Sequence, residues 1–204
     1  MDRKQKSVGL LIALAALTAT LASVFAYYPV TATLEPTSPP VYFAAGTNAG
    51  QDDIGSGNTI SVAIGSNGAS LSFTVHPTYQ TCYWKNIAII RNDDDSKAYN
   101  IYLKVVTPVS GLPSGSKARI YVYTQGTTRS LSDYPTPEPT SGTYSGTYVD
   151  LTTTGTTAIY IGQLSSNSFY EIDVYTYIPE DSTLPSPASA QLLLIYTPSD
   201  ETPP

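Results

Sequence analysis

The alternation that decides the fold lies in the stretch Tyr99-Asn100-Ile101-Tyr102-Leu103-Lys104-Val105. Its odd-numbered positions are apolar or aromatic, and the positions between them are more polar. Side chains of a β-strand point alternately to opposite faces, so this stretch predicts a strand that turns its odd-numbered side chains toward a core. A strand with one apolar face is typical of antiparallel sheets.

A tight hairpin is predicted earlier in the chain. Two alternating segments, 59–64 and 71–75, flank Asn67-Gly68, the residue pair that best tolerates the positive φ angles of a short turn. A second pair of strands is predicted at 83–91 and 98–106, joined by the acidic turn 92–96.

Composition extends this interpretation to the whole body of the chain. There are 17 tyrosines, 16 prolines and 14 glycines, with many Thr, Val and Ile residues, which favours strands and turns over helices. We expect an all-β fold, an antiparallel β-sandwich that is jelly-roll-like, with an immunoglobulin-like sandwich as the alternative. The remaining strands are predicted at 41–44, 118–124, 147–151, 157–161, 168–178 and 188–197.

Two of these strands carry specific expectations. In 168–178, one face holds Tyr170, Ile172, Val174 and Ile178, and the other holds Glu171, Asp173, Tyr175 and Tyr177, so one side is expected in water. The last strand contains Leu192-Leu193-Leu194-Ile195, which is apolar on both faces. It should therefore lie centrally in a sheet or be covered by a partner.

Residues 1–26 have the pattern of an export signal. Arg3, Lys4 and Lys6 precede an apolar run, and Ser23-Val24-Phe25-Ala26 supplies the small or short residues of a cleavage site. Cleavage after Ala26 would leave 178 residues. The whole chain has a net charge of −6, and the signal holds three basic residues and one acidic residue, so the mature chain would have a net charge of −8. A retained membrane anchor is the alternative. If the signal is cleaved, the mature protein is expected outside the cell, with membrane contact only during export.

Cleavage would expose a short extended arm, Tyr27-Tyr28-Pro29-Val30-Thr31-Ala32-Thr33-Leu34. Val30, Ala32 and Leu34 fall on one face of a strand, so the arm is suited to adding a donor strand to a neighbour's sheet. Pairing of the arm within its own domain is the alternative. The expected organisation is a signal peptide (1–26), an arm with a Pro-rich hinge (27–40), a sandwich domain (41–197) and a disordered tail (198–204).

Residue types suited to catalysis or metal binding are sparse, and we expect no enzyme, cofactor or metal site. His76 is the only histidine, which excludes His-rich zinc sites, and it is expected to be an ordinary loop residue. The run Asp93-Asp94-Asp95 lacks the spacing of a dedicated calcium loop and is expected to be a solvated turn, with an ion as the alternative. Glu171 and Asp173 have the composition of a glycosidase pair, but exposed acidic pairs on strands are common.

Other residues bear on partners. The acidic balance argues against nucleic acid and anionic membranes. Trp84 and the tyrosines leave open a secreted carbohydrate-binding sandwich module. Cys82 is the only cysteine, which rules out an intrachain disulfide, and it is expected to be buried, with an intermolecular bridge or a reactive thiol as the alternative. Segment 125–146 is either a surface loop or an exposed contact element between filaments.

Several segments together resemble a known family. They are the signal ending at Phe25-Ala26, the arm, the entry Pro39-Pro40-Val41-Tyr42-Phe43, and the segments 85–92 and 98–103. This layout resembles the TasA and camelysin family, and most closely the archaeal bundling pilus subunits related to it. Camelysin relatives have been called metalloproteases, but no zinc site is matched here and that activity is not carried over.

The resemblance implies a jelly-roll subunit that polymerises by donor-strand complementation, in which each N-terminal arm fills a groove in the next subunit. Its partners would be identical subunits in a head-to-tail homopolymer and neighbouring filaments, bundled in a biofilm matrix and joining cells. A type IV pilin-like subunit with a retained N-terminal helix is the alternative assembly. Residues 10–14 lack the Glu that is usual early in such a helix.

Overall fold

The computed structural model describes residues 3–5, 7–8, 10–11, 28–132, 138–139, 143–155, 157–187 and 189–201, with the backbone alone for 143–147. The chain divides into two units, residues 1–37 and residues 38–204. The described residues before position 12 are helical, and residues 28–37 form no regular secondary structure. The predicted cleavage site and Tyr27 lie outside the described residues. Among the residues that are described, no helix is long and apolar enough to cross a membrane.

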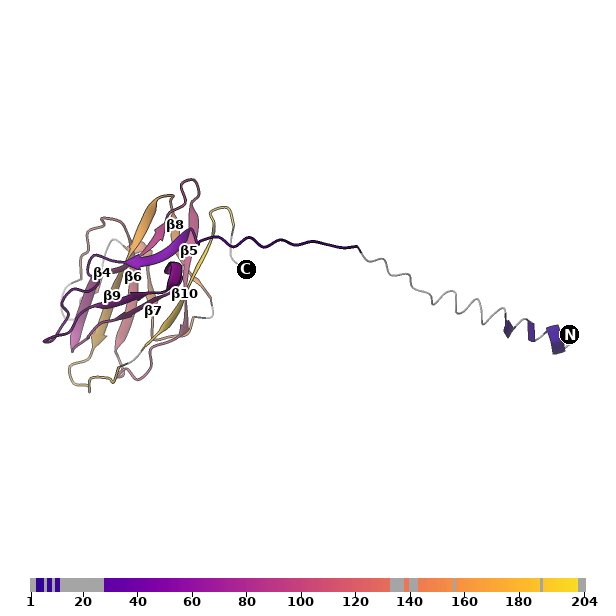
Figure 1. The fold of residues 1–204 in the computed structure, drawn as a ribbon. Coiled ribbons are helices and arrows are strands. Elements are labelled where there is room, and N and C mark those ends of the chain that lie inside the picture. The colour runs from indigo at the N-terminus through magenta and orange to yellow at the C-terminus, as the bar shows by residue number, and fades with distance from the viewer. Residues whose placement is uncertain are drawn as a thin grey trace. The chain divides into compact units, whose positions relative to one another are not determined.

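The second unit is made of strands (Figure 1). Its described elements are β1 (Val41–Ala45), β2 (Ser61–Ile64), the 3-10 helix η1 (Ser66–Gly68), β3 (Leu71–Thr74), β4 (Gln80–Asn92), β5 (Tyr99–Thr107), β6 (Lys117–Thr124), β7 (Thr143–Asp150), β8 (Ile159–Leu164), β9 (Ser168–Ile178) and β10 (Gln191–Pro198).

These strands form three sheets. The order is β1-β4-β9-β6-β7 in the five-stranded sheet and β10-β5-β8 in the three-stranded sheet, with β2 and β3 as a separate pair. Every pairing is antiparallel. The predicted all-β antiparallel sandwich is therefore confirmed.

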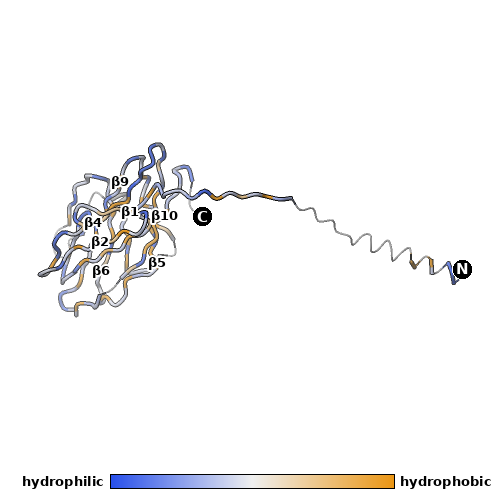
Figure 2. The backbone as a smooth tube through the Cα atoms, viewed as in Figure 1, coloured by the Kyte–Doolittle hydropathy of each residue, from blue (hydrophilic) through white to orange (hydrophobic). Residues whose placement is uncertain are grey.

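The core contains the inward side chains of the two larger sheets. Ile90 and Ile172 of the five-stranded sheet and Ile101 and Leu103 of the three-stranded sheet belong to one cluster of buried residues. Tyr99 and Val105 also belong to this cluster, so the predicted inward face of segment 99–105 is confirmed. Figure 2 shows hydrophobic residues concentrated on the strands and hydrophilic residues in the loops between them. Burial of this apolar surface is the main force that holds the two sheets together.

The predicted hairpin is also confirmed. Strands β2 and β3 pair antiparallel, and the turn between them places Asn67 at φ 58° and Gly68 at φ 68°. Gly68 is required for a second reason, because a Cβ there would lie 2.7 Å from Cβ of Tyr42 and 2.8 Å from the carbonyl oxygen of Phe43. The turn thus packs directly against β1.

The predicted pairing of segments 83–91 and 98–106 is wrong. These segments became β4 and β5, which lie in different sheets. The acidic turn carries the chain from one sheet to the other, and similar crossings link β5 to β6, β7 to β8, β8 to β9 and β9 to β10. Such crossings are typical of Greek-key and jelly-roll sandwiches. Alternation shows which face of a strand is covered, but it does not show which strand lies beside it.

The expectation that one side of segment 168–178 faces water is also wrong. Strand β9 lies between β4 and β6, and Glu171, Asp173 and Tyr175 on its outer face are buried. A second cluster of buried rings, Tyr121, Tyr123 and Tyr175, covers this face of the sheet. The polar side chains are buried because other polar groups, described below, replace water.

The end of the chain differs from the prediction in two ways. Strand β10 is at an edge of its sheet, so a central position within this chain is wrong. Residues 198–201 are not a disordered tail, because the N–H of Ser199 donates to the carbonyl of Ala98, and Asn100 Nδ2 donates to the carbonyls of Ser199 and Glu201. A side chain in β5 thus holds the segment that follows β10.

Candidate functional site

The predicted donor arm is extended and exposed. Residues 28–37 form no helix or strand, and Tyr28, Val30 and Leu34 expose 84%, 88% and 89% of their surface. Figure 2 shows hydrophobic stretches along this segment. The structure places Tyr28, Pro29, Val30, Thr31, Ala32, Thr33 and Leu34 in this exposed segment, and Tyr27 lies outside the described residues. Several large apolar side chains exposed along one short segment indicate a contact surface for another molecule.

Strand β10 is the second feature that suits an interaction. Its sequence, Gln-Leu-Leu-Leu-Ile-Tyr-Thr-Pro, has no charged residue, and Leu193 exposes 52% of its surface. Natural proteins usually protect edge strands with charges, prolines or bulges, because free N–H and C=O groups recruit other strands. In β10 the proline comes only at the last position and the bulge only at the first step, between Gln191 and Leu192. Among the described residues, no strand pairs with the free side of β10, so the middle of this edge can accept a further strand.

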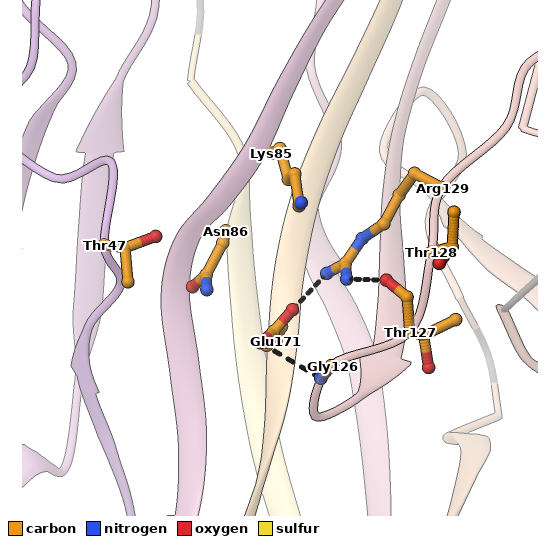
Figure 3. Close-up of a pocket in the computed structure, with 8 residues that line it drawn as sticks. All are labelled: Thr47, Lys85, Asn86, Gly126, Thr127, Thr128, Arg129 and Glu171. Carbon is orange, nitrogen blue, oxygen red and sulfur yellow. Dashed lines mark hydrogen bonds and ion pairs between the residues drawn. The ribbon is translucent and has the colours of Figure 1, made fainter.

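A polar pocket of about 380 Å³ lies on the outer face of the five-stranded sheet (Figure 3). Its lining includes Lys85 and Asn86 from β4, Glu171 from β9 and Arg129 from the loop after β6. Asn86 lies in a bulge of β4 with φ 45°, and its Oδ1 is buried without a hydrogen-bond partner among the described residues. The pocket is thus formed where the strand bulges and the loop folds over it.

Arg129 is the centre of this arrangement. Its Nη2 donates to Glu171 Oε2 over 2.5 Å, its Nε donates to Asp173 Oδ2 over 2.9 Å, and its guanidinium lies 4.2 Å from the ring centre of Tyr123. Burial alone would lower the pKa of Arg129, but the hydrogen bonds and charges of Asp173 and Glu171 outweigh it and raise that pKa. The arginine therefore stays charged in the interior.

Asp173 uses both of its oxygens inside the protein. Besides Arg129, it accepts hydrogen bonds from the backbone N–H of Asn86 over 2.7 Å and from the hydroxyl of Tyr83. Burial, and then the hydrogen bond to this carboxylate, raise the pKa of Tyr83. Glu171 and Asp173 are thus not an exposed acidic pair. They share one arginine, and Asp173 exposes 0% of its surface, so a substrate cannot reach it in this conformation.

Sequence reasoning missed the role of the loop after β6. Segment 125–146 was expected to be an exposed surface segment, yet Arg129 exposes only 7% of its side chain. Further along, the carboxylate of Glu138 binds Lys117 and Arg119 of β6. The sequence did contain a signal for this contact, because Arg129 is the one arginine of a Thr-rich loop and Glu171 and Asp173 lie on a largely apolar strand. Pairing them required knowledge of where the loop folds.

His76 lies in the loop between β3 and β4, as expected, and its partly exposed side chain belongs to a second polar cluster, around the buried carboxylate of Asp53. Its backbone N–H donates to Asp53 Oδ2, and its Nδ1 lies 2.8 Å from the same oxygen. Trp84 Nε1 donates to Asp53 Oδ1 over 2.6 Å, and the Asp53 side chain is 1% exposed. Burial tends to raise the pKa of Asp53, but the hydrogen bonds from Trp84 and His76 lower it. The cluster fastens the loop after β1 to β4.

The acidic turn distributes its three carboxylates among different partners. Asp93 binds Tyr42 and Arg91, Asp94 accepts the N–H groups of Ser96 and Lys97, and Asp95 accepts from Asn167. The N–H groups of Ser96 and Lys97 lower the pKa of Asp94 to about 2. Within the described ranges, no group of three or more His, Cys, Asp or Glu side chains is arranged to hold a metal ion.

Cys82 is buried, as expected, with 4% of its surface exposed, and its sulfur accepts the N–H of Thr78. Comparison with known protein families and with curated proteins finds no match for this chain.

Proposed function

We propose that this chain is the structural subunit of an extracellular filament, polymerised by insertion of the N-terminal arm of one subunit into the sheet of the next. One observation carries the proposal: an uncharged extended arm, which precedes the sandwich domain in the chain, presents Tyr28, Val30 and Leu34 to water. The resemblance of the sequence layout to the TasA and camelysin family and to archaeal bundling pilus subunits supports the same function.

The energetic reason for insertion is burial of the arm. Each large apolar side chain that leaves water contributes about 1.5–3 kcal/mol, and each backbone hydrogen bond a net of about 0.5–1.5 kcal/mol. Residues 28–34 contain no ionisable side chain except the Tyr28 phenol, so insertion buries no charge. Extended peptides that add a strand to an exposed sheet edge are a recurring mode of recognition.

The geometry of such a contact leads to a filament. An arm that binds the next subunit is a heterologous contact, in which the two contacting surfaces differ. Each subunit then offers one free arm and one free acceptor, so growth continues at both ends. The proposed location is the cell surface, and lateral contacts between filaments would form bundles that join cells in a biofilm matrix.

The experiment that tests this function compares four forms of the full chain, all expressed with the export signal. They are the natural sequence, a deletion of residues 28–34, the pair Val30→Asp and Leu34→Asp, and the control pair Thr31→Asp and Thr33→Asp. We expect filaments in negative-stain images from the natural chain and from the control, whose charges lie on the opposite face of the arm.

The deletion and the apolar-face pair should be secreted as folded monomers with the strand signal of the natural protein in circular dichroism. Filaments of normal appearance from the deletion variant would refute arm insertion. Loss of filaments in the control pair alone would show that the apolar face is not the one buried.

A further inference from the structure

We infer that the acceptor for the arm is the open edge of β10, and that its occupant is residues 30–35 of a second copy of this chain. The inference rests on the proposed function and adds to it the place where the arm binds. Strands β1, β7, β8 and β10 are the outer strands of the two larger sheets.

Burial separates β10 from the other three outer strands of the two larger sheets, whereas the inward residues of the separate pair β2 and β3 are also only partly buried. Val41 of β1, Val149 of β7 and Ile161 of β8 expose 2%, 0% and 2% of their surface, so the core is sealed at each of those strands. No residue of β10 is fully buried. Leu192, Leu194 and Tyr196 pack against the core but stay partly exposed. The hydrophobic core is therefore unfinished at β10.

Burial of the inward side chains decreases sharply from β5 to the adjacent strand β10. Leu192, Leu194 and Tyr196 of β10 lie opposite Val105, Leu103 and Ile101 of β5. The three β5 residues expose 2%, 2% and 0% of their surface, whereas their β10 partners are only partly buried. One more strand beside β10 would cover the inward side chains of β10 in the way that β10 covers those of β5. Its outward residue Leu193, 52% exposed, also suits a strand with neighbours on both sides.

The arm matches this edge in length, pattern and charge. Pro29 and Pro36 lack an N–H and limit the donor strand to residues 30–35, which is shorter than the eight residues of β10. With Val30, Ala32 and Leu34 turned to the core beside the inward residues of β10, Thr31 and Thr33 lie on the outer face near Leu193. Residues 30–34 and β10 carry no charged side chain, and the one charge of the donor strand, Glu35, lies at its last position.

Cysteine cross-linking tests the location. Two chains with different tags are co-expressed and exported, one with Thr33→Cys or Thr31→Cys in the arm and the other with Leu193→Cys in β10. The matched control replaces Leu193→Cys by Tyr160→Cys, which lies on the other outer strand of the same sheet and exposes 44% of its surface. Native Cys82 is buried and stays in place. Sheared filaments are treated with a short bismaleimide and separated by mass.

We expect a dimer band that carries both tags for at least one of the two arm positions with Leu193→Cys, and at least tenfold less of it with Tyr160→Cys. Filaments with a stronger band to Tyr160→Cys, or with no band to Leu193→Cys, would overturn the β10 acceptor and leave arm insertion standing. A dimer from Leu193→Cys chains alone would mean that two β10 edges pair with each other, which also overturns it. Absence of filaments from the natural chain would instead refute the proposed function.

Discussion

Arg129 and Asp173, 44 residues apart in the chain, form a contact at two points. Nε donates to Oδ2 over 2.9 Å, and Nη2 donates to Oδ1 over 3.2 Å. The arginine belongs to the loop after β6, and the aspartate lies in β9, the middle strand of its sheet. This contact folds the loop over the sheet and turns a polar strand face into part of the interior.

Replacement of Arg129 by Ala should destabilise the protein strongly. The substitution leaves Glu171 and Asp173 buried without a cation, and removal of one partner from a buried pair costs about 3–5 kcal/mol. Urea unfolding of the monomeric deletion variant of the arm measures this loss. Arg91→Ala is the matched control, because Arg91 is 45% exposed and binds the exposed Asp93. Its loss should be about 0–1 kcal/mol, and equal losses for the two variants would contradict the buried cluster.

Asp53→Asn should change how stability depends on pH. The folded pKa of Asp53 lies below its usual value of 3.8, so the stabilising effect of the carboxylate is complete above that value and is lost as the pH falls through the folded pKa. We expect the variant to be about 1.5–3 kcal/mol less stable at pH 7. The difference from the natural chain should shrink as the pH falls from 4 toward 2.

The fluorescence of Trp84 reports this change locally, because it is the only tryptophan and it donates directly to Asp53. Unfolding curves at a series of pH values, recorded from this signal, give the stability of both chains. A difference that stays constant between pH 7 and pH 2 would show that the charge of Asp53 is not involved.

Gly68→Ala should be more harmful than Gly50→Ala. Both glycines have positive φ, 68° and 76°, so both substitutions carry a backbone cost of about 1–2 kcal/mol. A Cβ at position 50 meets no atom within 4 Å, whereas at position 68 it meets Tyr42 Cβ at 2.7 Å. Overpacking should add about 1–3 kcal/mol at position 68. Thermal unfolding of the two variants should rank them in this order, and the opposite order would place the β2–β3 turn away from β1.

The mature N-terminus distinguishes the assembly alternatives. Filaments sheared from cells should contain subunits that begin at or near Tyr27, as measured by intact mass and N-terminal sequencing. A start near Leu10 would favour a type IV pilin-like helix in the filament core. A soluble monomer that begins near Tyr27, without filaments in the same fraction, would favour a secreted carbohydrate-binding module.

Local patterns allowed the strands and their inward faces to be predicted. The two-residue period of segment 99–105 identified the buried face of β5, and Asn67-Gly68 identified the turn between β2 and β3. Both features depend on residues within one segment, where side-chain direction follows directly from backbone geometry. The sequence by itself therefore determined the all-β class, much of the core and the apolar face of the arm.

Only the tertiary structure decided which segments meet. It separated β4 from β5 into two sheets, placed β10 at an edge, and brought Arg129 to Glu171 and Asp173. An alternating pattern reports that a side chain is covered, but neither its neighbours nor the strand order are encoded in that period. From its own strand, a carboxylate is expected to face solvent. Its charge can be buried favourably only when a cation lies beside it, and here that cation comes from a distant loop.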